Sequence, residues 1–172
     1  MIQKRVLEPG LLYFAYGCNM DHAFLESVLG RQISPGWAAR VDGWRLAFNK
    51  GGEGEAGGGV VANLVSAEEG TTYGVVYRLP FESLAALDEF EGAPEHYRRD
   101  TLFVEPVGRQ ALQAAVTYLG QPRWIVSEGK PPEDYLDLVV RGAATHGIPG
   151  DYIDWLRLLA NLEAVGCYRV GL

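Results

Sequence analysis

The chain has 172 residues, of which 48% are hydrophobic and 22% charged, and its formal net charge is −7 at pH 7. This length and composition are typical of one globular domain, residues 1–172, that can bury a sizeable core. The acidic balance excludes nucleic acid as the expected partner, and the lack of an apolar run of about 20 residues excludes a membrane-spanning helix.

Cysteine usage indicates a reducing compartment. Cys18 and Cys167 could form one disulfide if the fold brought them together. Two cysteines in a chain that can build its own core are more typical of free thiols. The first ten residues also lack the apolar stretch of a secretory signal. We therefore expect a cytoplasmic protein.

The first 80 residues are predicted to be mostly β-structure with one helix. An apolar run that stops at Gly17 predicts a buried strand, and Asn19 or Asp21 can cap the helix that follows. Asp42-Gly43, between two β-rich segments, is a strong signal for a two-residue hairpin turn. The elements expected here are strand 11–16, helix 21–29, strands 36–41 and 44–48, loop 51–59, and strands 60–66 and 72–79.

The remainder is predicted to contain three helices and a second hairpin. Pro80 just before a helical pattern and Gly92 just after it are the expected start and stop signals. The elements expected here are helix 81–91, strands 97–107 and 112–119, and helices 133–146 and 151–162. Mostly antiparallel strands with a few helices imply an α+β domain.

Two candidate sites are weak. The glycine-rich segment 51–59 is not followed by Lys-Ser or Lys-Thr, so it is not a phosphate-binding P-loop. We expect a surface loop there that could act as a flap over a pocket. His22, His96 and His146 are scattered, with no second ligand at a metal-binding spacing, and no metal is expected.

The end of the helix at 81–91 is a stronger candidate. Asp88, Glu89 and Glu91 crowd its last turn, where the helix dipole and mutual repulsion both disfavour ionised carboxylates. Glu91 shares the helix face of Leu84 and Leu87 and could therefore point inward. The two interpretations are a solvated acidic helix end and a carboxyl group with a raised pKa, suited to proton transfer.

The sharp turn that follows the first strand is the other candidate. The sequence YFAYGCN ends an apolar strand at Gly17, and the amides from Gly17 to Asn19 can converge on an anion or a carbonyl oxygen. Cys18 could instead be a thiolate nucleophile with His22 or His96 as its base. A buried, unreactive cysteine is the simpler interpretation.

Together these segments resemble the gamma-glutamylcyclotransferase family. YFAYGCNM resembles that family's strand and Tyr-Gly-Ser-Asn turn, and YGVVYRLPFESLAALDEFEG resembles the strand and helix that carry its acidic residue. YLDLVVRGAATHGIP is similar to the helix that closes its pocket. The resemblance runs from about Leu12 to Trp155. It implies a small mixed, mainly antiparallel barrel with helices around it, and no metal or organic cofactor.

The resemblance also implies site residues. Glu91 matches the family's general acid and base, and Cys18 stands where the family usually has Ser. The residues expected to bind the small-molecule gamma-glutamyl substrate are Tyr16, Gly17, Cys18, Asn19, Tyr97, Tyr118 and Tyr135.

The expected reaction is an intramolecular cyclisation. A gamma-glutamyl compound carries its own nucleophile, the α-amine, so that ring closure releases 5-oxoproline and an amine without an enzyme nucleophile. Glu91 would take a proton and later deliver one. Two alternatives remain open on the same scaffold: acyl transfer through Cys18, and a binding module that holds gamma-glutamyl ligands without turnover.

Overall fold

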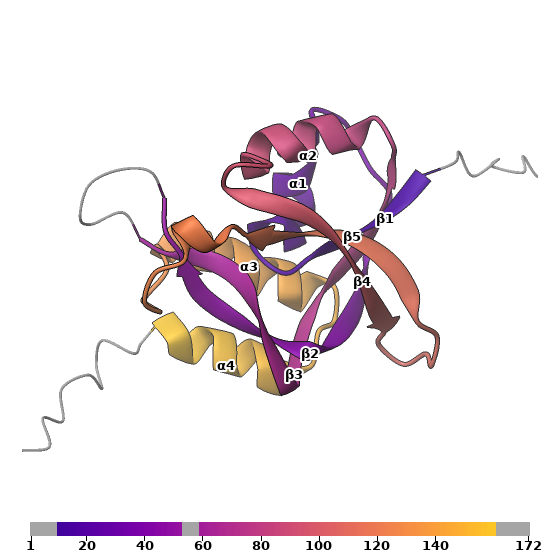
Figure 1. The fold of residues 1–172 in the computed structure, drawn as a ribbon. Coiled ribbons are helices and arrows are strands. Elements are labelled where there is room, and N and C mark those ends of the chain that lie inside the picture. The colour runs from indigo at the N-terminus through magenta and orange to yellow at the C-terminus, as the bar shows by residue number, and fades with distance from the viewer. Residues whose placement is uncertain (1–9, 53–58, 161–172) are drawn as a thin grey trace, which may run out of the picture.

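A computed structural model describes residues 10–52 and 59–160 of the chain (Figure 1). The central part of the predicted loop at 51–59, the end of the predicted helix at 151–162, and Cys167 lie outside these residues. Within them, the architecture is one closed barrel with helices packed around it, as Figure 1 shows.

Five strands form the barrel, and their order around it differs from their order along the chain. The strands are β1 (Gly10–Ala15), β2 (Trp37–Lys50), β3 (Val61–Pro80), β4 (Tyr97–Pro106) and β5 (Gln113–Gly120). Around the barrel the order is β1-β3-β2-β4-β5, and β5 closes onto β1. Among the strand pairs of residues 10–52 and 59–160, only β1 and β5 run parallel, where Tyr13 lies opposite Val116. The predicted α+β class, with a mixed and mainly antiparallel barrel, is confirmed.

The predicted hairpin at Asp42-Gly43 is wrong. β2 is one continuous strand, in which Asp42 lies opposite Thr71 of β3 and Trp44 lies opposite Ser66. Gly43 has φ +81°, and the pairing register shifts there instead of the chain reversing. A bulge and a tight turn both use a glycine at positive φ, so the local sequence cannot distinguish them.

The segments predicted as separate strands 60–66 and 72–79 are likewise the two halves of β3. Residues 67–70 of β3 lie opposite the single residue Gly43 of β2, so the extra residues of this register shift belong to β3. The two long strands therefore bend together, and this bend helps a five-stranded sheet to close into a barrel.

Four α-helices and two 3₁₀ turns complete the described part. They are η1 (Cys18–Met20), α1 (His22–Leu29), α2 (Ser83–Glu91), η2 (Pro122–Trp124), α3 (Glu133–Thr145) and α4 (Gly150–Ala160). α2 lies above the barrel in the view of Figure 1, and α4 lies below it. Gly92 takes φ +62° and ends α2 where the sequence predicted. None of the helices in the described ranges has the length and hydropathy of a bilayer span.

β1 leads directly into the candidate site. It pairs with β3 on one side and with β5 on the other, so its backbone is hydrogen-bonded along both edges. Its apolar composition matches this central position. Phe14 is fully buried, and its carbonyl accepts a hydrogen bond of 2.9 Å from the Thr117 hydroxyl of β5. The barrel therefore fixes the position at which the residues after β1 begin.

Candidate active site

The turn after β1 is compact and held by its own backbone. The Met20 N–H donates to the Gly17 carbonyl at 3.0 Å, and the Asp21 N–H donates to the Cys18 carbonyl at 3.0 Å. Gly17 has φ −115°, so positive φ does not explain the glycine. Space explains it, because a Cβ at Gly17 would lie 2.6 Å from the Tyr135 hydroxyl.

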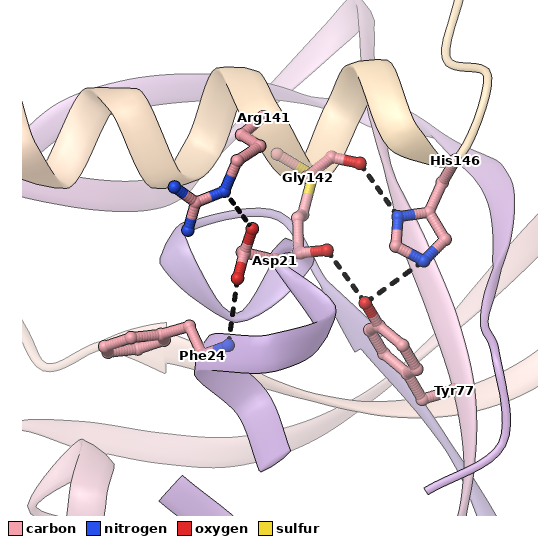
Figure 2. Close-up of polar contacts among 7 residues, drawn as sticks. Asp21, Phe24, Tyr77, Arg141, Gly142 and His146 are labelled. Atoms are coloured by element: carbon pink, nitrogen blue, oxygen red, sulfur yellow. Dashed lines mark hydrogen bonds and ion pairs between the residues drawn. The ribbon is translucent and has the colours of Figure 1, made fainter. Parts of the chain in front are cut away.

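Asp21 fixes the far end of this turn. Of the two predicted caps, Asp21 is the residue that caps α1, since its carboxylate accepts from the Phe24 N–H at 2.9 Å. The same carboxylate accepts from Arg141 Nε of α3 at 2.6 Å (Figure 2). This hydrogen bond lowers the pKa of Asp21, so the carboxylate remains ionised at neutral pH.

α3 and β3 both contact the turn and fix its position. A Cβ at Gly142 of α3 would lie 2.4 Å from the Met20 carbonyl carbon, so the glycine permits close packing of helix and turn. The Tyr77 hydroxyl of β3 donates to the Met20 carbonyl at 2.8 Å. His146 contacts this hydroxyl and the Gly142 carbonyl, as Figure 2 shows. The turn is therefore anchored to both α3 and β3.

A cavity of about 420 Å³ lies against this turn. Tyrosines dominate its lining, and the described residues around it come from β1, η1, α1, β3, α2, β4, β5 and α3. They are Tyr13, Tyr16, Gly17, Cys18, Asn19, Phe24, Val61, Ala62, Phe90, Glu91, Tyr97, Thr117, Tyr118, Asp134, Tyr135 and Leu138. All eight residues predicted for the site, Glu91 included, are brought together here.

Glu91 is the carboxyl group that faces the turn across the cavity. It is the last residue of α2, and its Oε1 accepts a hydrogen bond from Asn19 Nδ2 at 3.1 Å. Asn19 Nδ2 also donates to the Tyr13 hydroxyl at 3.0 Å. Burial raises the pKa of Glu91 to about 7, and the positive charge of Lys50 opposes this shift. Glu91 can therefore gain or lose a proton near neutral pH.

The three carboxyl groups at the end of α2 diverge. Asp88 accepts from the Tyr118 hydroxyl at 2.7 Å and lies 3.1 Å from Arg99 Nε, whereas Glu89 is exposed to solvent. Only Glu91 of the three lines the cavity. The raised pKa of Glu91 was predicted from the helix dipole and mutual repulsion, but its main cause is burial.

The cavity tyrosines are fixed by hydrogen bonds to the barrel. The Tyr16 hydroxyl donates to the Tyr118 carbonyl, and the Tyr97 hydroxyl donates to the Ala62 carbonyl at 2.8 Å. The Tyr135 hydroxyl accepts from the Ala62 N–H at 3.2 Å. Burial raises the pKa of every one of these tyrosines, so the hydroxyls remain protonated. These tyrosines are therefore uncharged, and hydrogen bonds hold them in place.

Cys18 does not have the environment of a nucleophile. Its thiol is free, and burial raises its pKa to about 12. Neither histidine considered as its base lines the cavity. His22 Nε2 lies 3.3 Å from Glu26 Oε1, and the His96 ring stacks on the Trp124 ring with 4.3 Å between their centroids. A protonated thiol without a neighbouring base is a poor nucleophile.

Sequence reasoning missed two residues that act on Glu91. Tyr13 shares the Asn19 amide with it, and Lys50 at the end of β2 opposes the rise of its pKa. Lys50 lies over the Tyr97 ring, 5.1 Å from its centroid. Its neighbour Asn49 is also buried. The sequence signal for this part of the site was the pair of consecutive polar residues, Asn49 and Lys50, at the end of an apolar strand pattern.

No three His, Cys, Asp or Glu side chains within the described ranges lie close enough together to hold a metal ion. The described lining offers a ligand the carboxyl groups of Glu91 and Asp134, the Asn19 amide, the Cys18 thiol, the Thr117 hydroxyl and several phenol hydroxyls. Asn19 Oδ1 is buried and has no hydrogen-bond partner among the described residues. An acceptor of this kind favours a ligand that carries an N–H or ammonium group.

Comparison with known proteins supports one family. A sequence model described as the AIG2-like family matches residues 71–156, half of the chain. The human protein named gamma-glutamylcyclotransferase is 25% identical over 165 residues, 92% of this chain and 84% of that protein. YkqA of Bacillus subtilis (strain 168), named provisionally as a gamma-glutamylcyclotransferase, is 29% identical over 154 residues, 81% of this chain. The chain spans about half of YkqA, with 48% of that protein covered.

Solved structures agree with the fold. A structure of a gamma-glutamyl cyclotransferase superposes with a TM-score of 0.76 at 22% identity, over 87% of this chain and 87% of that one. At 22% identity the structural likeness shows only that the folds agree. The family assignment depends on the match to the sequence model. The chain belongs to the AIG2-like, or gamma-glutamylcyclotransferase-like, family.

Proposed function

We propose that this protein cyclises small gamma-glutamyl compounds, releasing 5-oxoproline and an amine or amino acid, with Glu91 as the general acid and base. The observation that carries the proposal is the place of Glu91. Its carboxyl group, with a pKa raised to about 7, lies in one cavity with the Gly17–Asn19 turn and bonds to Asn19 at 3.1 Å. Relatives named gamma-glutamylcyclotransferases support the general activity.

The proton balance of the reaction fits a single carboxyl group. The substrate α-nitrogen loses two protons as it changes from ammonium to lactam N–H, and the departing nitrogen gains two as it leaves as an ammonium ion. Between these events the α-nitrogen attacks the side-chain carbonyl carbon, and the original amide C–N bond breaks. Glu91 can carry the protons in turn and end in its starting state. A carboxyl group with an ordinary pKa of about 4.3 would donate poorly at pH 7.

The tyrosines and the turn provide the remaining interactions in this proposal. The Tyr13 and Tyr135 hydroxyls accept hydrogen bonds from Asn19 and from the Ala62 N–H and keep their own protons. These hydroxyls and the amides of the turn are donors for the substrate carboxylate or for the oxyanion of the tetrahedral intermediate. Asn19 Oδ1 is an acceptor for the α-ammonium group. One donor to the oxyanion contributes about 3–4 kcal/mol to lowering the barrier.

The alternatives have less support. Acyl transfer through Cys18 needs a thiolate, but burial raises the pKa of this thiol to about 12. A non-catalytic binding module would need the cavity but not a proton carrier. The position and raised pKa of Glu91 therefore favour turnover over binding alone.

A substrate panel tests the proposal. The purified protein is incubated with gamma-glutamyl-alanine, the gamma-glutamyl-lysine isomers and glutathione, and 5-oxoproline is quantified. We expect release from at least one of them, and no release by Glu91→Gln. Calorimetry on the same compounds distinguishes the binding module, which would show heat of binding without product. An acyl adduct on Cys18, detected by mass spectrometry after brief incubation, would favour covalent transfer.

A further inference from the structure

A second cavity lies at the opposite end of the barrel. Its volume is about 940 Å³, and it shares no lining residue with the first cavity. β4 begins at Tyr97 in the first cavity and ends at Pro106 in the second, whereas β5 runs from Gln113 in the second cavity to Tyr118 in the first. The first turns of α3 line the first cavity with Asp134 and Tyr135, and its last residue, Thr145, lines the second. The two cavities are therefore separate sites.

The charge of this second cavity is opposite to that of the protein. Its lining includes Arg78, Arg109, His22 and His146, and none of its described lining residues is an aspartate or a glutamate. Both arginines are exposed, and within the described residues neither forms an ion pair. In a chain with a net charge of −7, such a lining is selective for anions.

The contacts of His146 connect the second cavity to the active-site turn. Its Nδ1 lies 2.8 Å from the Gly142 carbonyl, and its Nε2 lies 3.3 Å from the Tyr77 hydroxyl (Figure 2). The same hydroxyl donates to the Met20 carbonyl at 2.8 Å. A ligand that contacts His146 is therefore one hydroxyl group away from the turn.

Gln113 supplies an independent sign of a ligand. Its Oε1 is buried and has no hydrogen-bond partner among the described residues, and the side chain lines the same cavity. A hydrogen phosphate group carries both the negative charge that the arginines require and an O–H that can donate to this oxygen. Trp37, also in the lining, offers a flat ring beside it.

We propose that the second cavity is a binding site for a phosphate group and that its occupancy acts on the active-site turn. An anion bound beside His146 acts on the ring that contacts the Tyr77 hydroxyl, and this hydroxyl donates to the Met20 carbonyl. Met20 ends η1, whose Cys18 and Asn19 line the first cavity. The binding site is independent of the proposed function, whereas its effect on turnover rests on it.

Nuclear magnetic resonance of the full chain tests the site without any assay of activity. Inorganic phosphate is titrated at constant ionic strength, with sodium chloride as the balancing salt, because exposed charges are screened by salt. We expect saturable shifts at Gln113, Thr145 and Gly147, and smaller ones at Cys18–Met20. The variant Arg78→Gln/Arg109→Gln should weaken binding at least about tenfold, the loss expected for charge-assisted hydrogen bonds.

A matched double variant controls for net charge. Arg31→Gln/Arg123→Gln also removes two exposed positive charges, but neither residue lines the cavity. Its affinity for phosphate should stay within about twofold of the wild type, since long-range charge effects are screened. Equal weakening by both double variants, or linear shifts without saturation, would overturn the site.

Two further experiments identify the source of the phosphate group and test whether its binding acts on the active-site turn. Tighter binding of adenosine monophosphate than of phosphate would support a phosphorylated nucleoside stacked on Trp37, and equal affinity would support free phosphate. Tyr77→Phe should retain the shifts at Gln113 but lose those at Cys18–Met20, because the hydroxyl link is removed. Shifts at the turn that persist in Tyr77→Phe would overturn the coupling and leave the site itself supported.

Discussion

The two cavities use polar groups in opposite ways. At one end of the barrel, the Glu91 carboxyl group lies among tyrosines, and burial raises its pKa to about 7, whereas Asp134 of the same lining is exposed. At the other end, two arginines lie exposed around two histidines, with no carboxyl group among the described lining residues. The first cavity withdraws one carboxyl group from water, and the second collects positively charged groups.

This difference indicates different tasks. Burial raises the pKa of Glu91 to about 7 despite the positive charge of Lys50, so this carboxyl group changes its protonation state readily near neutral pH, which suits proton transfer. Guanidinium groups keep their charge in any environment of this kind and attract anions. Closure of the barrel separates the two environments, since β4 and β5 each reach both ends.

Replacing the isolated carboxyl group should have the largest effect. Glu91→Gln keeps the shape of the side chain and can still accept from Asn19, but it cannot carry a proton. We expect 5-oxoproline formation to fall about 10²–10⁴-fold in kcat, the contribution of general acid–base catalysis. Glu89→Gln is the matched control, because it removes an exposed carboxyl group two residues earlier on the same helix. Equal activity of the two variants would contradict the assignment of Glu91.

Disturbing the wall of the first cavity should have the next largest effect. In Gly17→Ala the added Cβ would lie 2.6 Å from the Tyr135 hydroxyl, so the turn or the tyrosine must move. A displacement of about 1 Å in an active site can cost about 10²-fold in rate. Gly150→Ala is the control, since nothing lies within 4 Å of the added Cβ there. Steady-state kinetics and circular dichroism on both variants separate loss of catalysis from loss of folding.

Local signals in the sequence predicted the two halves of the first site. Gly17 and Asn19 mark the turn, and Gly92 fixes where α2 ends and thereby where Glu91 lies. Turns and caps depend on a few neighbouring residues, so a single sequence contains the information for them. The reason for Gly17 was not predictable, because it is the approach of Tyr135, a residue more than a hundred positions later.

Features that depend on barrel closure could not be predicted in the same way. The bulge at Gly43 differs from a hairpin only through its pairing with β3, and the role of Tyr13 depends on the bond to Asn19 across the end of β1. The second cavity joins residues from five separate stretches of the chain. In the sequence its histidines were noted as lacking a metal-ligand spacing, and His22 also as a possible base for Cys18.

The raised pKa of Glu91 should also appear in stability. The pKa is raised from 4.5 to about 7 on folding, so between these values the folded state binds more protons than the unfolded state. The free energy of unfolding contributed by Glu91 therefore falls as the pH rises from about 4.5 to 7, by on the order of 2–3 kcal/mol. Urea unfolding of wild type and Glu91→Gln across this range measures the difference. Parallel pH profiles would show that the carboxyl group is not desolvated.

The smallest effect is expected for Cys18→Ser, which tests whether the first cavity contains a second reactive group. The thiol is protonated because burial raises its pKa to about 12, and it lies against the Tyr135 hydroxyl. A serine hydroxyl can occupy the same place and bond to that tyrosine, while the backbone amides of the turn are unchanged. Activity should stay within about fivefold of the wild type, the effect of one ordinary hydrogen bond of about 1 kcal/mol. A loss as large as that of Glu91→Gln would instead assign covalent chemistry to Cys18, and the cavity would then have two reactive groups.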